Sequence, residues 1–129
     1  MSQRFGKEHK LKSKQEIDTL FKKGKRIHAP IVLLVHHAEK MEEVHEGTPR
    51  LLVSVPKRNF KKAVDRNLLK RRIRESYRIQ LKEFEVGTAT SYQCYFALVY
   101  KDTRIRDFNE IKSSITLLLR KLEVKNKEL

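Results

Sequence analysis

The chain has 129 residues, a length that suits one domain with a modest hydrophobic core. Its 30 Lys and Arg residues outnumber the 16 Asp and Glu residues and give a formal net charge of +14, which destabilises a compact chain unless a polyanion neutralises it. This charge favours nucleic acid as the partner, with an anionic membrane surface as the second candidate.

Membrane insertion and secretion are not expected from this sequence. Its first ten residues contain no apolar stretch like that of a secretory signal, and the longest apolar run, residues 31–35, is too short to cross a bilayer. The single cysteine, Cys94, lies in an alternating apolar run and cannot form a disulfide within the chain. We interpret it as a small buried hydrophobic residue rather than a reactive thiol, and we expect a cytoplasmic protein.

The first predicted element is a short helix over residues 13–23. Ser13 and Glu16 have the spacing of a capping box, and Gly24 suits the end of the helix. Three apolar residues at helical spacing form one face, namely Ile17, Leu20 and Phe21.

Two strands are predicted next. Residues 31–36 and 50–55 are short apolar runs beside prolines, as expected for buried strands. Residues 39–49 between them are polar and contain a glycine and a proline, so they predict an exposed loop.

The second half of the chain predicts a helix, a strand and a final helix. A basic helix is expected over residues 62–85 with Gly87 as its stop, and residues 92–100 form the clearest strand, rich in aromatic and β-branched residues. Asp107 and Glu110 predict the start of the last helix. Its apolar stripe, which we expect to pack on the sheet, consists of Phe108, Ile111, Ile115, Leu118 and Leu122.

These elements predict one α+β domain over residues 1–129, in the order α-β-β-α-β-α, with a small sheet packed by helices. The basic helix follows the second strand, and a further short strand cannot be placed. We expect residues 1–12 to form a flexible basic arm and residues 123–129 to form a frayed tail.

The basic helix and the turn before it are the candidate binding surface. Asp65 is the only acid between residues 57 and 74, whereas solvated helix faces usually intersperse acids with bases. On a helical projection one side of the helix is apolar and is formed by Leu69, Ile73, Tyr77 and Phe84. The cations lie on an adjoining arc, where guanidinium and ammonium groups can bind phosphates. The charge alone does not distinguish RNA from DNA. The candidate nucleic-acid-binding residues are Lys57, Arg58, Lys61, Lys62, Arg66, Asn67, Lys70, Arg71, Arg72, Arg74 and Arg78.

Residues 54–75, SVPKRNFKKAVDRNLLKRRIRE, resemble the signature of the bacterial ribonuclease P protein subunit. The shared features are a strand ending in Ser-Val, a basic turn, and a helix that begins Ala-Val and carries Arg-Asn, Lys-Arg and Arg-Glu pairs. The helix end Phe-Lys-Lys-Gly at residues 21–24 and the order of the flanking elements agree as well.

Two departures from the family pattern concern the binding residues. Leu68 stands where the Arg-Asn-Arg motif has its second arginine. Arg72, one turn later and about 40° away on the helix, is the cation placed to replace it. Residues 31–36 are aliphatic where family members often have aromatic residues, which leaves Phe21 as the aromatic candidate for base stacking.

The resemblance implies a subunit of ribonuclease P that joins a catalytic RNA and helps remove the 5′ leader of precursor tRNA. It implies that the RNA carries out catalysis, with Mg²⁺ held by RNA and substrate, and that no protein side chain is catalytic. It also implies a cleft for the leader between the first helix and the sheet, with Ile17, Phe21 and His36 as candidate lining residues.

A structural RNA-binding protein, such as a ribosomal protein, is the main alternative, although it would not bring the ordered motif. A DNA-binding regulator would need a dimer face, and no separate apolar seam exists for one. A protein-only nuclease would need clustered carboxylates, whereas the glutamates gather in the predicted loop. The histidines lack the spacing of zinc ligands, so we expect no metal site in the protein. Since RNA is the expected partner, we expect neither a DNA partner nor a membrane partner.

Overall fold

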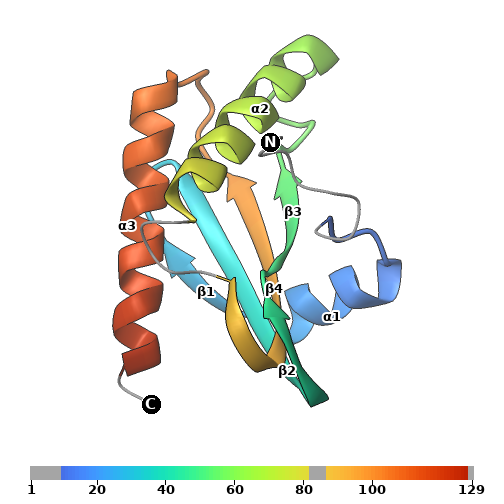
Figure 1. Cartoon of the computed structure of the whole chain (residues 1–129). Coiled ribbons are helices and arrows are strands. Elements are labelled where there is room, and N and C mark those ends of the chain that lie inside the picture. The colour runs from blue at the N-terminus through green and yellow to red at the C-terminus, as the bar shows by residue number, and fades with distance from the viewer. Residues whose placement is uncertain (1–9, 82–86, 128–129) are drawn as a thin grey trace, which may run out of the picture.

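A four-stranded sheet in the order β1-β2-β4-β3 forms the centre of the molecule (Figure 1). The computed structural model describes residues 10–81 and 87–127. Its elements in chain order are α1 (Lys14–Lys23), β1 (Lys25–His28), β2 (Val32–Gly47), β3 (Arg50–Ser54), α2 (Ala63–Gln80), β4 (Gly87–Tyr100) and α3 (Phe108–Lys127). The predicted α+β class and the basic helix after a strand are confirmed.

The strands combine antiparallel and parallel pairing. β2 pairs antiparallel with both β1 and β4, whereas β3 pairs parallel with β4, with Leu51 opposite Phe96. A parallel pair requires a crossover connection, and α2 provides it between β3 and β4. The basic helix is therefore the crossover of a β-α-β unit within the sheet.

The two faces of the sheet carry separate hydrophobic clusters because neighbouring strand residues point to opposite faces. Val32 and Leu34 of β2 belong to the cluster that α2 and α3 cover, whereas Val35 belongs to the cluster with Leu20 of α1. Figure 1 shows this arrangement, with α2 and α3 on one side of the sheet and α1 on the other.

The first helix forms as predicted. The backbone N–H of Glu16 donates to Ser13 Oγ at 3.4 Å, as the capping spacing requires. Gly24 ends the helix in an extended conformation, and it is needed for close packing rather than for an unusual φ angle. A Cβ atom at this position would lie 2.3 Å from the carbonyl oxygen of Leu20 and 2.7 Å from Val35 Cγ1.

The predicted loop over residues 39–49 is wrong, because β2 continues to Gly47 and pairs with β4 along this length. An antiparallel ribbon can expose both of its faces to water, so a polar sequence does not exclude a strand. Register shifts after Lys40 and His45 interrupt the alternation that sequence reasoning needs. The strand that could not be placed is β1 at Lys25–His28.

The ends of several elements differ from the predictions. α2 ends at Gln80, five residues before the predicted end, and residues 82–86 lie outside the described part of the chain. α3 extends to Lys127, so the backbone of the predicted frayed tail is helical as far as that residue. Residues 1–9 of the predicted arm also lie outside the description, but residues 10–12 are ordered against β3.

The last helix packs as its stripe predicted. Ile111, Ile115, Leu118 and Leu122 are buried, whereas Phe108 at the start of the stripe is only half-buried. The backbone N–H of Glu110 donates to the Asp107 carboxylate at 2.8 Å. Within residues 10–81 and 87–127, no helix is both long enough and apolar enough to span a bilayer.

Candidate nucleic-acid interface

The buried side of α2 fixes the orientation of the basic helix. Leu69, Ile73 and Tyr77 are each fully buried, as the four-residue spacing predicted, and Tyr77 meets Phe96 of β4 edge to face at 6.3 Å between ring centroids. Burial raises the pKa of Tyr77 far above its ordinary value, so its phenol stays neutral. The opposite side of the helix is thereby directed away from the sheet.

A polar contact between helices secures the C-terminal end of α2. The Gln80 side chain is fully buried, and its amide donates to the carbonyl oxygen of Lys112 at 3.3 Å. The hydroxyl of Thr116 donates to the amide oxygen of Gln80. A buried amide with both ends hydrogen-bonded holds α2 and α3 in one register.

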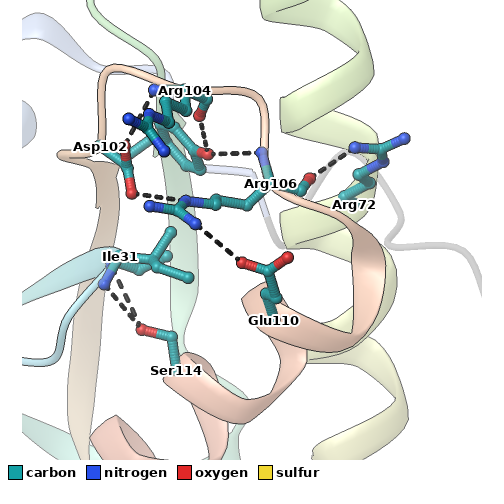
Figure 2. A network of polar contacts seen from close by, with 9 residues as sticks. Ile31, Arg72, Asp102, Arg104, Arg106, Glu110 and Ser114 are labelled. Carbon is teal, nitrogen blue, oxygen red and sulfur yellow. Dashed lines mark hydrogen bonds and ion pairs between the residues drawn. The ribbon is translucent and has the colours of Figure 1, made fainter.

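The middle of α2 is tied to the connection between β4 and α3. Arg72 Nη1 donates to the carbonyl oxygen of Arg106 at 2.5 Å (Figure 2). The Arg106 guanidinium in turn binds Asp102 at 2.8 Å and Glu110 at 3.2 Å. The hydroxyl of Tyr100 accepts from the Arg106 N–H at 3.0 Å and donates to the carbonyl oxygen of Arg104. Arg72 is therefore a structural contact of α2 as well as a cation.

Asp102 is the acidic centre of this connection. The backbone N–H of Arg104, 2.9 Å from its carboxylate, lowers the pKa of Asp102, and the Arg106 guanidinium lowers it further, while partial burial acts in the opposite direction. The carboxylate thus stays ionised and holds Arg106 in place.

On the same side of the sheet, Ser114 of α3 holds the start of β2. Its hydroxyl oxygen accepts hydrogen bonds from the N–H groups of Ile31 at 3.2 Å and Val32 at 3.3 Å (Figure 2).

The first turn of α2 is stabilised by its own arginine. Lys62 stands at the N-cap and provides no side-chain cap. Arg66 Nη1 instead donates to the carbonyl oxygens of Phe60 and Lys61, both at 2.8 Å. This guanidinium shapes the turn that carries Lys57, Arg58 and Lys61.

Arg78 near the end of α2 is paired with an acid. Its guanidinium donates to the Glu75 carboxylate three residues earlier. This hydrogen bond lowers the pKa of Glu75 and raises that of Arg78. The pair contributes less net positive charge to the surface than Arg78 alone would.

The other eight candidate residues have no such partner. None of their side chains forms an intramolecular hydrogen bond or ion pair with any residue in the described part of the chain. All are solvent-exposed except Lys70, which is half-buried. They are Lys57, Arg58, Lys61, Lys62, Asn67, Lys70, Arg71 and Arg74. These seven cations and one amide form a cationic surface in which no acid of the described residues makes an ion pair.

Two of the three predicted leader-cleft residues lie on the α1 side of the sheet. Ile17 and Phe21 pack against Leu20 and Val35 there, as expected. His36 does not lie on this face, because it is paired with Phe96, whose side chain belongs to the α2 and α3 side. The prediction for His36 is therefore corrected.

His37 and Tyr95 occupy the face on which His36 was expected. Their rings stack with centroids 6.5 Å apart and planes 23° from parallel. They line a hollow of about 280 Å³ between α1, β2 and β4, which Glu16 and Glu39 also line. Burial, followed by a hydrogen bond to Glu16, raises the pKa of Tyr95 to about 12, so the ring is neutral over the ordinary pH range.

The described residues contain no group of three or more His, Cys, Asp or Glu side chains close enough to hold a metal ion.

The sequence family is decided by a match along most of the chain. A model of the ribonuclease P family matches residues 5–123. The chain belongs to the ribonuclease P family. Its cationic α2 surface and its α1 hollow are thus features of a ribonuclease P family member.

Curated ribonuclease P family proteins are similar to this chain over different lengths. The ribonuclease P protein component of Petrotoga mobilis is 33% identical over 124 residues, which cover 94% of this chain and 97% of that protein. The one from Nitrosococcus oceani is 36% identical over 59 residues, which cover 46% of this chain and 45% of that protein.

Solved structures of RNase P proteins share the fold. A Staphylococcus aureus RNase P protein mutant with defective mRNA degradation activity superposes with a TM-score of 0.70 at 19% identity, covering 91% of this chain and 90% of that one. The RNase P protein of Thermotoga maritima gives a TM-score of 0.66 at 21% identity, covering 86% and 96%.

Sequence reasoning missed several residues that this ribonuclease P family fold uses. The alternation along residues 92–100 could have identified Tyr95, because it places this aromatic residue on the face opposite Cys94 and Phe96. Gln80 and Ser114 carried no signal, because their partners lie on other elements far away in sequence.

Proposed function

We propose that this protein is the protein subunit of ribonuclease P and that it binds the catalytic RNA through α2 and the turn before it. The cationic surface supports this proposal most directly, because its eight side chains have no intramolecular partner among the residues that the structure describes. The fold commits its other α2 arginines to its own oxygens but leaves these groups to water. Phosphate oxygens are the partners that such a surface selects.

The role of the surface in the reaction follows from its charge. Removal of a 5′ leader requires a catalytic RNA and a precursor tRNA to approach each other, and their phosphates repel. Lys and Arg side chains between them lower that repulsion and release counterions, which reduces the Mg²⁺ concentration needed for activity. Mg²⁺ bound by the RNA and the substrate would supply the activated water and stabilise the leaving oxygen.

The hollow beside α1 is the proposed position of the leader. The stacked rings of His37 and Tyr95 provide a planar surface in the hollow. Ile17 and Phe21 do not line it but pack in the hydrophobic cluster on the same face of the sheet. Single-stranded RNA is held by stacking of its bases on such rings. Tyr95 takes the place that sequence reasoning gave to His36.

The decisive experiment is cleavage of a precursor tRNA by a bacterial ribonuclease P RNA at low Mg²⁺, with and without the protein. We expect strong stimulation at the correct 5′ site, and no cleavage by the protein alone. Tight, salt-sensitive binding to the RNA without any stimulation would overturn the proposal in favour of a structural RNA-binding protein.

A further inference from the structure

The segment at residues 10–12 is part of the folded domain and not of a flexible arm. Lys10 forms a parallel bridge with Leu51, and the backbone N–H of Leu11 donates to the carbonyl oxygen of Leu51 at 3.0 Å. The Leu11 side chain is only 4% exposed and packs with Leu20 in the α1-side cluster. The segment therefore extends the sheet beyond β3 and fixes the positions of Lys10 and Lys12.

Docking of this segment creates a second hollow of about 130 Å³ at the outer edge of the sheet. Its lining combines an apolar floor from β3 with three cations, one of which comes from the basic helix. The lining residues are Lys10, Leu11, Lys12, Leu51, Leu52, Val53 and Arg74. Two separate parts of the sequence thus bring positive charge to one small space.

The three cations have no acidic counterpart in the described part of the chain. Lys10, Lys12 and Arg74 form no ion pair there, and no carboxylate lines the hollow. Glu75 follows Arg74 directly but is bound by Arg78. Three uncompensated cations around one hollow repel one another, and a bound anion relieves that repulsion.

The size of the hollow limits the anion. Pockets for drug-sized ligands usually occupy about 300–1,000 Å³. At about 130 Å³ this hollow suits a single anionic group rather than a whole nucleotide. An ammonium group binds phosphate as a point charge, and a guanidinium can bind two of its oxygens at once.

We propose that Lys10, Lys12 and Arg74 together bind one backbone phosphate of an RNA, which joins the N-terminal segment to α2 in one interface. The inference rests on the proposed function only for the identity of the RNA. The chemistry is the same for a phosphate of the catalytic RNA and for one of the precursor tRNA.

The first test needs no RNA. Sodium phosphate is titrated into the full chain at constant ionic strength, and backbone amide shifts are followed by NMR. We expect saturable shifts at Leu11 and at Leu51 to Val53, which disappear in the triple variant Lys10→Gln, Lys12→Gln, Arg74→Gln. Equal, non-saturating shifts along all of α2 would overturn the site, whatever the outcome for cleavage activity.

The second test measures coupling between the two sides of the hollow. Lys12→Gln and Arg74→Gln each weaken binding to the RNA that supplies the phosphate by about tenfold, and the double variant lowers the salt slope by about 0.9, the value for one phosphate contact. Because both side chains bind one phosphate, the double variant loses less than the product of the two single losses. In the control pair Lys12→Gln and Arg58→Gln, the losses multiply, since Arg58 does not line the hollow.

Two arms identify the source of the phosphate. One arm measures affinity for the catalytic RNA, and the other measures affinity of the assembled complex for precursor tRNA. If the double variant loses less affinity for the catalytic RNA than the product of the two single losses, the phosphate belongs to the catalytic RNA. If this shortfall is seen only for precursor tRNA, the phosphate belongs to the precursor. Multiplicative losses in both arms overturn the shared site. All variants should keep the unfolding midpoint of the parent chain, because the substituted side chains are exposed.

Discussion

The two sides of α2 use the same residue types for different purposes. On the side held to the rest of the molecule, Arg66 and Arg72 donate to carbonyl oxygens of the chain itself. On the outer side, Arg71 and Arg74 have no partner in the described residues. Charge patterning alone therefore overstates the number of arginines available to a ligand, since part of the positive charge holds the helix in place.

The largest expected effect comes from the buried side. Ile73→Ala removes a fully buried side chain between α2 and the sheet and should lower the free energy of unfolding by about 2–5 kcal/mol. Urea denaturation measures this loss. The matched outer variant, Arg71→Ala, should change stability by no more than about 0.5 kcal/mol. Equal losses in the two variants would remove the distinction between the sides.

Arg72 tests whether a cation on α2 is structural. Arg72→Ala leaves the half-buried carbonyl oxygen of Arg106 without its charged donor and should destabilise the fold by about 1–3 kcal/mol. Thermal unfolding gives the stability, and RNA binding at several salt concentrations gives the number of phosphate contacts. We expect an unchanged salt slope for Arg72→Ala and a slope lowered by about 0.9 for Arg71→Ala. A lower slope with unchanged stability for Arg72→Ala would make Arg72 an RNA contact instead.

Leu68→Arg adds a cation where the family motif has its second arginine. Leu68 is half-buried, so the longer side chain can reach solvent from this position. Affinity for the catalytic RNA should increase by about twofold to tenfold, and the salt slope should steepen by about 0.9. Leu68→Gln serves as the uncharged control. An unchanged slope would show that no phosphate lies near this turn of the helix.

The smallest effect is a pH dependence that originates at Asp102. Its pKa is lower in the folded chain than in the unfolded chain, so its contribution to stability is present above the ordinary aspartate pKa of about 4 and is lost as the pH falls through the lower folded value. The unfolding midpoint measured from pH 6 to pH 2 should fall less steeply for Asp102→Asn than for the parent chain. Parallel curves would assign the acid sensitivity to other carboxylates.

The sequence predicted features that depend on local spacing. The buried residues Leu69, Ile73 and Tyr77 and the cap at Ser13 follow from helical periodicity. The face occupied by His36 depended on the register with β4, which pairs it with Phe96, and no local pattern determines that register. The contact of Arg72 depended on a carbonyl group 34 residues away. Strand pairing and long-range hydrogen bonds therefore account for the corrections.

The parallel pairing of β3 with β4 also has a consequence for the order in which the elements fold. Arg50 pairs with Tyr95 across a long loop, so we expect this ladder to form late in folding. α2 occupies that loop and packs on Phe96 of β4 through Tyr77. The basic helix thus acquires its final orientation only when the sheet is complete. We therefore expect a newly synthesised chain to present its finished cationic face as one of the last steps of folding.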